Sequence, residues 1–499
     1  MSIRQSLFAA ATASILALAM GPVVASSGAS GQTALQPVDL TVMTFNIWYG
    51  ATVTHGLDEV VRAIREAGAD VVGLQEPYAR TRRIAKALGF HASPRMHLVS
   101  RFPILEPAGS NGDWAYLLLA PGEVAAIANT HLTCCPYTPY RIVNRGFGPA
   151  EALTQERRTR LDQIRAHLSA LGPLLSAGVP TFFTGDFNAP SHRDWTSAAV
   201  RARGLPYTMH WPVSLAMEET GFRDSYREVY PDPVTDPGFT WTAGYPAPYV
   251  YPWEVFDRID FVWAAGPVET NATQVIGESR ANADLAIRPW PSDHRAVASS
   301  FTVTPAPMPV SVVAEGESAR LGLPLRARFH AEGSGDHVIL TASGSTTPLA
   351  DLPTGSAPDG TMAFDTTQLE QGAYDVVLVD ATDTELSRDT VVLIAHDQPP
   401  ELTVADPTLE DDQRLEVSWA FAPGNQFDWL AVFRAGHSAK GDPYLTWRYT
   451  EARIDGSLPI GPGARGSAPW PLRAGRYEVR LCLDDSYRCR GSAPFRVLG

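Results

Sequence analysis

The chain has 499 residues, a formal net charge of −14 at pH 7, 44% apolar residues and 19% charged residues. At about 150 residues per domain this length predicts about three domains, and the composition excludes a disordered chain. An acidic chain without a block of lysine or arginine does not attract nucleic acid through its overall field. A nuclease stays open, because a bound metal can supply positive charge where a phosphate lies.

The N-terminal segment has the layout of a signal peptide. Arg4 precedes an apolar run from Leu7 to Met20, and about 14 apolar residues are too few to cross a bilayer. We therefore predict a signal peptide at 1–25, a linker at 26–37 and a secreted or periplasmic protein; an uncleaved anchor is the alternative.

Strand and helix patterns alternate over residues 38–303. The predicted strands are Leu40–Ile47, Val71–Gln75, Val124–His131 and Thr181–Asp186, and the predicted helices are Leu57–Ala67 and Glu151–Leu171. This alternation predicts a layered α/β domain.

Short alternating runs replace the helical period after Thr302–Val310, and His396–Glu401 reads as a second linker. We predict two all-β, immunoglobulin-like sandwich domains at 310–396 and 401–499. The pattern of Leu369, Gly372 and Tyr374 recurs 103 residues later as Leu472, Gly475 and Tyr477, which indicates a tandem repeat.

Two cysteine pairs have different predictions. Cys482 and Cys489 flank a predicted hairpin, so we expect a disulfide across it. For the adjacent Cys134 and Cys135, a vicinal disulfide, two free thiols and a soft-metal pair all remain open, and we favour a redox-structural role.

Six stretches of the α/β domain are apolar strands that end in polar residues, and we expect these ends to face a common cleft. They are Thr44-Phe45-Asn46, Leu74-Gln75-Glu76, Asn129-Thr130-His131, Gly185-Asp186-Phe187-Asn188, Arg258-Ile259-Asp260 and Ser292-Asp293-His294. Their carboxylate and amide oxygens suit Mg²⁺ or Mn²⁺, and their two histidines can hydrogen-bond a phosphate or transfer a proton. These are the groups that phosphoester hydrolysis needs.

These motifs resemble the endonuclease/exonuclease/phosphatase superfamily over residues 38–303, with Ser100-Arg101-Phe102-Pro103-Ile104 as a further familiar segment. The resemblance implies a four-layer α/β sandwich of the DNase I type. It implies Glu76 as a metal ligand, with Asn46 and Asp293 close by, and Mg²⁺ or Mn²⁺, with Ca²⁺ a further option, as the cofactor.

The resemblance also implies the catalytic roles. His294, oriented by Asp260, would be the general base or a transition-state donor, and we favour the base. Asp186 and Asn188 would position water and phosphate, and His131 would hold a phosphate oxygen. This chain departs from the common pattern between Glu76 and the segment from Arg95 to Ser100, where the usual loop is shortened.

Some sequence features allow two interpretations. Arg157 and Arg160 fit a salt-bridged helix face better than a phosphate contact. The aromatic run Trp241, Tyr245, Tyr249, Tyr251 and Trp253 is either a substrate lip or membrane-touching rim, or a packing surface.

The resulting hypothesis is a secreted, metal-dependent phosphodiesterase or phosphatase that acts on a phosphoester substrate. Its C-terminal β domains would contact a surface, a polymer or the catalytic domain. An extracellular endonuclease acting on nucleic acid, or a sphingomyelinase- or phospholipase C-like enzyme acting on membrane lipid, is the alternative. A non-enzymatic binding scaffold is the least favoured hypothesis.

Overall fold

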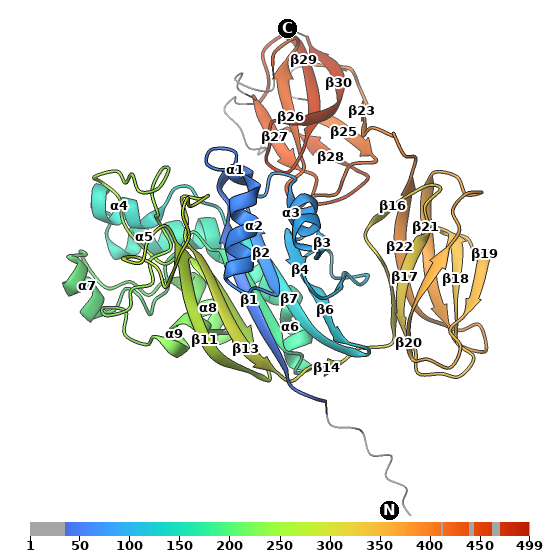
Figure 1. The fold of residues 1–499 in the computed structure, drawn as a ribbon. Coiled ribbons are helices and arrows are strands. Elements are labelled where there is room, and N and C mark those ends of the chain that lie inside the picture. Colours follow the sequence, from blue (N-terminus) through green and yellow to red (C-terminus); the bar gives the residue numbers. More distant parts are fainter. Residues whose placement is uncertain (1–34, 411–412, 439–443, 462–469, 499) are drawn as a thin grey trace, which may run out of the picture. The chain divides into compact units, whose positions relative to one another are not determined.

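The computed structural model describes residues 35–410, 413–438, 444–461 and 470–498 (Figure 1). The predicted signal peptide, residues 1–25, and most of the predicted linker, 26–37, lie outside the described residues. Within the described ranges, no helix combines the length and the apolar character that a membrane span requires.

Two large sheets form the N-terminal part of the described chain. The first has the order β12-β11-β13-β1-β2-β4-β3. Its strands are β1 (Val38–Asn46), β2 (Val71–Gln75), β3 (His91–Ser93), β4 (Leu98–Ser100), β11 (Val268–Gly277), β12 (Leu285–Ala286) and β13 (Ala296–Val303). The second has the order β5-β6-β7-β8-β10-β9, and β14 pairs with β7. Its strands are β5 (Ile104–Leu105), β6 (Ala115–Ala120), β7 (Glu123–His131), β8 (Thr181–Asp186), β9 (Arg223–Asp224), β10 (Asp260–Ala265) and β14 (Ala306–Pro307).

Three apolar clusters show how these sheets are layered. One lies between the sheets and joins Val42 and Val71 to Ile127 and Phe182. A second packs α2 (Leu57–Glu66) and α3 (Thr81–Leu88) on the first sheet, and a third packs α6 (Asp162–Ser176) and α8 (Pro212–Glu219) on the second. Because β1, β2, β7 and β8 are covered on both faces, their sequences are nearly continuous apolar runs. The layering is helix, sheet, sheet, helix, as predicted for this part of the chain.

The remaining helices lie in connections between strands. They are α1 (Trp48–Ala51), α4 (Thr138–Arg145), α5 (Pro149–Glu156), α7 (Ser197–Arg203) and α9 (Ser225–Val229). The single helix predicted at Glu151–Leu171 is interrupted, because a π-helical turn at Arg157–Leu161 separates α5 from α6. Arg160 in this turn is fully buried and pairs with Glu156, which agrees with the predicted salt-bridged helix face.

Each of the two C-terminal β regions combines a three-stranded sheet with a five-stranded sheet. The first region has the orders β15-β17-β20 and β16-β22-β21-β18-β19. Its strands are β15 (Ser311–Ala314), β16 (Ser318–Arg320), β17 (Leu325–His330), β18 (His337–Ala342), β19 (Pro348–Pro353), β20 (Asp359–Phe364), β21 (Gly372–Val379) and β22 (Glu385–Ile394).

The second region repeats this order as β23-β25-β28 and β24-β30-β29-β26-β27. Its strands are β23 (Glu401–Val404), β24 (Thr408–Leu409), β25 (Leu415–Ala420), β26 (Trp429–Arg434), β27 (Thr446–Tyr449), β28 (Gly456–Ile460), β29 (Gly475–Cys482) and β30 (Cys489–Val497). In each region one apolar core joins both sheets. The predicted disulfide between Cys482 and Cys489 is present across the β29–β30 hairpin.

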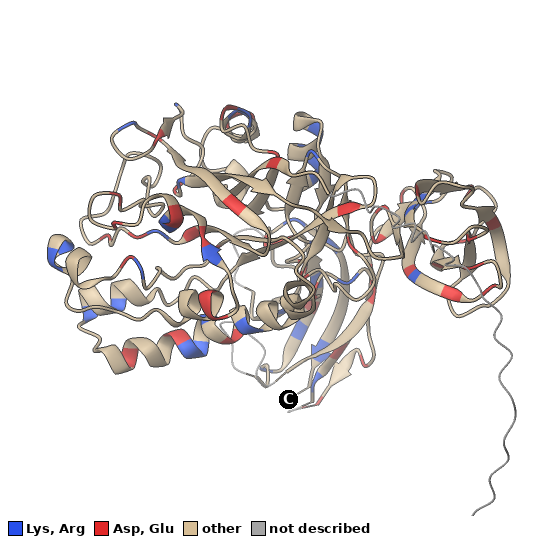
Figure 2. Ribbon diagram, turned by 90° about the horizontal axis from the view of Figure 1, so that it is seen from below, with Lys and Arg blue, Asp and Glu red and all other residues tan. Residues whose placement is uncertain are grey.

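Acidic and basic residues are interspersed along the helices and strands (Figure 2). The proline-rich stretch after β13 is tied to the second sheet, because Ala306 and Pro307 of β14 pair with Val124 and Glu123 of β7. This pairing fixes the chain where a linker was predicted.

Candidate active site

The candidate active site lies where strands of both sheets end. In the second sheet Asp186, the last residue of β8, is paired with His131 of β7 on one side and with Asp260 of β10 on the other. In the first sheet Asn46, the last residue of β1, is paired with Gln75, the last residue of β2. The sheet register therefore brings the predicted polar residues to one end of the two sheets.

The carboxylate of Asp186 is the centre of the cluster. Its Oδ2 accepts a hydrogen bond from Asn46 Nδ2 at 3.0 Å, and it lies 3.4 Å from His131 Nε2 and 3.6 Å from His294 Nε2. Its Oδ1 accepts a hydrogen bond from the backbone N–H of Asn188. Side chains from the ends of β1 and β7 and from the loop before β13 thus meet on a single buried aspartate at the end of β8.

His294 is held in one orientation by its neighbours. Its Nδ1 lies 2.9 Å from Asp260 Oδ2, and its ring lies 4.7 Å from the ring of Trp241. Its backbone N–H donates to the hydroxyl of Ser292, which itself donates to the carbonyl of Asn46. With Nδ1 facing Asp260, the atom that faces the rest of the site is Nε2.

Glu76 and Asp293 form the other end of the cluster. Glu76 directly follows β2 with a left-handed backbone, φ +55°, and its carboxylate accepts from Tyr49 N at 2.8 Å and from Asn46 Nδ2 at 3.5 Å. Asp293 is buried, and its Oδ1 has no hydrogen-bond partner. Left-handed backbone costs free energy in residues other than glycine and is concentrated at functional sites.

Asn188 also has a left-handed backbone, φ +49°. Its side-chain Nδ2 donates to the carbonyl of Leu132, which directly follows His131. Asn188 therefore ties the β8 end to the loop that follows β7, while the predicted contact with water or phosphate stays a prediction.

The excess of acidic groups determines the pKa values in the cluster. Burial raises the pKa of Asp293 to about 7, and burial also raises the pKa of Asp260. Burial alone lowers the pKa of His294, but Asp260 and Asp186 outweigh it and raise the pKa to about 10. Without a cation the imidazole is therefore protonated at neutral pH, whereas the predicted base requires a neutral ring.

The donor atoms fit a hard divalent cation. Asp186, Asp260 and His294 each offer one ligand atom, and these atoms lie within 4.8 Å of one another. Asp260 Oδ1 and Asp293 Oδ1 are buried without a hydrogen-bond partner, as expected of oxygens that await a cation. Of the predicted ligands, Glu76 and Asn46 adjoin this group, because Asn46 Nδ2 donates to both Glu76 and Asp186, and Asp293 directly precedes His294 in the chain.

A family model described as "Endonuclease/Exonuclease/phosphatase family" matches residues 43–294, just over half of the chain. The chain belongs to the endonuclease/exonuclease/phosphatase family. This membership makes the chain a hydrolase that acts on phosphoester bonds, and it agrees with the DNase I-like layering of the two large sheets.

The individual relatives do not indicate a more specific function for this chain. The Caenorhabditis elegans protein F14F9.5, described as uncharacterized, is 32% identical over 292 residues, which cover 53% of this chain and 91% of that protein. An endonuclease/exonuclease/phosphatase from Beutenbergia cavernae is 19% identical and covers 71% of this chain and 100% of its own, with a TM-score of 0.35. An AP endonuclease from Archaeoglobus fulgidus is 18% identical and covers 52% and 98%, also with a TM-score of 0.35. A TM-score of 0.35 is too low for either structure to indicate the fold or the function of this chain.

Gln75 and Asn129 were expected to face the cleft with the other polar strand ends, but they lie in a buried layer of polar groups. Asn129 donates to the carbonyls of Leu74 and Met96 and accepts from Gln75 and Thr184. A Cβ atom at Gly73 would lie 2.4 Å from Asn129 Oδ1, so only glycine allows the sheets to approach here. The sequence could have indicated this layer, because Asn129 precedes the predicted site residue His131 by only two residues.

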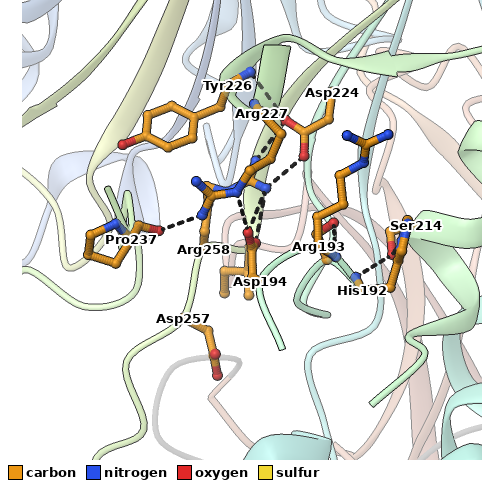
Figure 3. A network of polar contacts seen from close by, with 12 residues as sticks. His192, Arg193, Asp194, Ser214, Asp224, Tyr226, Arg227, Pro237, Asp257 and Arg258 are labelled. Atoms are coloured by element: carbon orange, nitrogen blue, oxygen red, sulfur yellow. Dashed lines mark hydrogen bonds and ion pairs between the residues drawn. The ribbon is translucent and has the colours of Figure 1, made fainter. Parts of the chain in front are cut away.

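A buried ion-pair network lies beside the site and consists of Arg227, Arg258, Asp194 and Asp224 (Figure 3). Arg258 donates to both carboxylate oxygens of Asp224 at 2.9 and 2.6 Å, and Arg227 Nε donates to Asp194 at 2.7 Å. Although burial raises the pKa of Asp194, the two arginines lower it overall. Arg258 is only two residues from Asp260, yet it belongs to this network.

The aromatic run contacts the active site directly. Trp241 packs on His294, and Glu254 accepts hydrogen bonds from Trp241 Nε1 at 3.0 Å and Tyr245 Oη at 2.8 Å. Tyr140 of α4 also donates to Glu254. One carboxylate therefore fixes three rings beside the site.

Two further features border the site. Cys134 and Cys135 are free and exposed, and Arg160 donates to the carbonyls of Cys134 and Pro136. Asp484, in the hairpin closed by the disulfide, accepts from the backbone N–H of Ala79 at 2.6 Å and lies 2.6 Å from His97 Nε2. Ala79 is three residues from Glu76, and no local sequence pattern indicated this contact.

Proposed function

We propose that this family member is a secreted, divalent-metal-dependent phosphodiesterase or phosphatase. The observation that carries the proposal is the meeting of Asn46, His131 and His294 on the carboxylate of Asp186. A bound Mg²⁺ or Mn²⁺ would neutralise charge that develops on the phosphoryl group and activate water. Glu76, Asn46 and Asp293 are the side chains that would hold it, and Asp186 and Asn188 would position water and phosphate.

The protein groups then have distinct tasks. His294 presents Nε2 to the substrate or the attacking water, and Asp260 keeps the imidazole ring in that orientation through Nδ1. His131, whose Nε2 lies beside the same Asp186 oxygen as that of His294, donates a hydrogen bond to a phosphate oxygen. The restrained rings and backbone mean that these groups need little reorganisation when substrate binds.

The other parts of the proposal rest on the sequence and on strand order. Residues 1–25 have the signal-peptide layout that supports export. The identical strand orders of the two C-terminal β regions support tandem immunoglobulin-like sandwiches. Their contact with a surface or polymer is part of the proposal.

A substrate panel tests the proposal. The full chain is incubated with bis-p-nitrophenyl phosphate, p-nitrophenyl phosphate, plasmid DNA, RNA, and choline- or inositol-containing phospholipid vesicles. Each substrate is tested in EDTA and after Mg²⁺, Mn²⁺ or Ca²⁺ is restored. We expect hydrolysis of a small phosphoester only with metal. DNA or RNA cleavage alone would make the enzyme a nuclease, and lipid cleavage alone a phospholipase C-like enzyme. Undiminished hydrolysis in EDTA would contradict the proposal.

A further inference from the structure

A groove borders the active site between helix α4 and Trp253. Its volume is about 490 Å³, within the range of small-molecule sites. Tyr137, Tyr140 and Trp253 supply aromatic walls, and Arg141 and Arg145 supply two guanidinium groups. None of these five residues belongs to the motifs that identified the catalytic cluster.

The groove is connected to the reacting centre by direct contacts. Trp241, whose ring packs on His294, donates from Nε1 to Tyr140 Oη at 3.2 Å. Tyr140 packs edge-on against Trp253, with ring centroids 5.5 Å apart. A substrate whose phosphate lies at His294 can therefore extend past Trp241 into the groove.

Hydrogen bonds fix the walls in place. Tyr140 donates to Glu254, and Tyr137 donates to the buried carboxylate of Asp257 at 3.1 Å. Asn144 of α4 donates to the carbonyl of Trp253 at 3.1 Å, which joins the two sides of the groove. Trp253 still exposes 50% of its surface. A restrained aromatic ring that remains open to solvent can stack on a ligand at low entropic cost.

The two arginines make the groove locally positive in an acidic protein. Arg141 and Arg145 lie one turn apart on α4, and within the described part of the chain neither forms a salt bridge with a carboxylate. A basic residue near a helix C-terminus, as Arg145 is in α4, stabilises the helix modestly. That effect does not account for the placement of both on an aromatic groove.

We propose that this groove binds the organic part of a small phosphate ester that carries a planar aromatic ring and a second anionic group. The proposal rests on the proposed function, because it assigns the part of the substrate that lies beyond the reacting phosphorus. The ring stacks on Trp253 and Tyr140, and the guanidinium groups bind the anion. Two arginines in a chain of net charge −14 suit a short ligand better than a polymer, whose binding needs many phosphate contacts.

The test measures binding of adenosine 3′,5′-bisphosphate, whose second phosphate supplies the further anion, to the full chain in EDTA by calorimetry, with glucose 6-phosphate and inorganic phosphate for comparison. We expect the nucleotide to bind at least about tenfold more tightly than either. The R141Q/R145Q double variant should lose about tenfold or more of this affinity, because two charge-assisted contacts are removed. W253A should weaken nucleotide binding and leave phosphate binding unchanged.

The matched control is R165Q/R201Q, which removes the same charge from exposed positions on α6 and α7. Equal binding by this control and the R141Q/R145Q variant would overturn the proposal, as would nucleotide binding no tighter than that of phosphate. Nucleotide binding in EDTA by a protein that hydrolyses none of the panel substrates when metal is restored would support the groove and contradict the proposed function. Hydrolysis without nucleotide binding would do the reverse.

Discussion

Two buried ionic clusters lie close together in this protein and differ in charge balance. The network of Arg227, Arg258, Asp194 and Asp224 pairs two cations with two anions, and its arginines lower the pKa of Asp194. The active-site cluster has more carboxylates than basic groups. There the pKa of Asp293 rises to about 7 and that of His294 to about 10.

The contrast separates a structural role from a catalytic one. Buried charges that are fully paired have no need of a further partner, and breaking the pair costs stability. Buried charges in excess lower stability unless a proton or a cation joins them, and such strained groups are concentrated at functional sites. We therefore predict that metal binding stabilises the active-site cluster, whereas the arginine–aspartate network loses stability only when one of its charged side chains is removed.

The largest expected effect is on catalysis, from His294→Ala. We expect kcat to fall about 10²- to 10⁴-fold, because the side chain that exchanges a proton with the reacting groups is lost. Initial rates on an activated phosphodiester with saturating Mn²⁺ measure it, and circular dichroism checks that the fold is retained. A rate within twofold of the parent would remove His294 from the mechanism.

Asp194→Asn tests the balanced network. We expect a loss of about 3 kcal/mol in the free energy of unfolding, because Arg227 and Arg258 lose a charged partner in the protein interior. Urea unfolding measures it, and Asp397→Asn at an exposed position is the control. Activity per folded molecule should be unchanged. A fall in kcat comparable to that of His294→Ala would mean that the network belongs to the catalytic machinery.

Metal should stabilise the protein only through the active-site cluster, which has more carboxylates than basic groups. At ten times its Kd, Mn²⁺ should add about 1.4 kcal/mol to the free energy of unfolding. The Asp194→Asn variant should keep this increment, whereas Glu76→Gln should lose most of it. Thermal unfolding with and without EDTA measures the effect. Equal increments in the parent and Glu76→Gln would exclude Glu76 as a ligand.

The smallest effect concerns Glu254, whose pKa burial raises to about 7. The folded state then holds a proton that the unfolded state has released, so Glu254 lowers stability as pH rises from about 4.5 to about 7. We expect less than about 1 kcal/mol, because the carboxylate is only partly buried. Asp194 acts in the opposite direction, since its lowered pKa removes stability as pH falls below about 4. Unfolding of Glu254→Gln across this pH range should show a shallower decline than the parent.

The sequence by itself determined the elements and the candidate residues. Apolar runs ending in polar residues located β2 and β8 at their observed bounds, Val71–Gln75 and Thr181–Asp186, because strand burial is encoded locally. The order of motifs indicated the family that the comparison shows. The repeat around Tyr374 and Tyr477 anticipated two β regions of identical strand order.

Only the tertiary structure decided which of these residues share a partner. Asp186 became the centre because sheet register places His131 and Asp260 on either side of it, and packing of the sheets brings Asn46 to it. Arg258 and Asp260 belong to different clusters, and Glu254 accepts hydrogen bonds from three aromatic side chains. Both arrangements depend on contacts between residues far apart in the chain. Periodicity and turn residues fix local conformation, whereas such contacts are selected by how whole sheets and helices pack together.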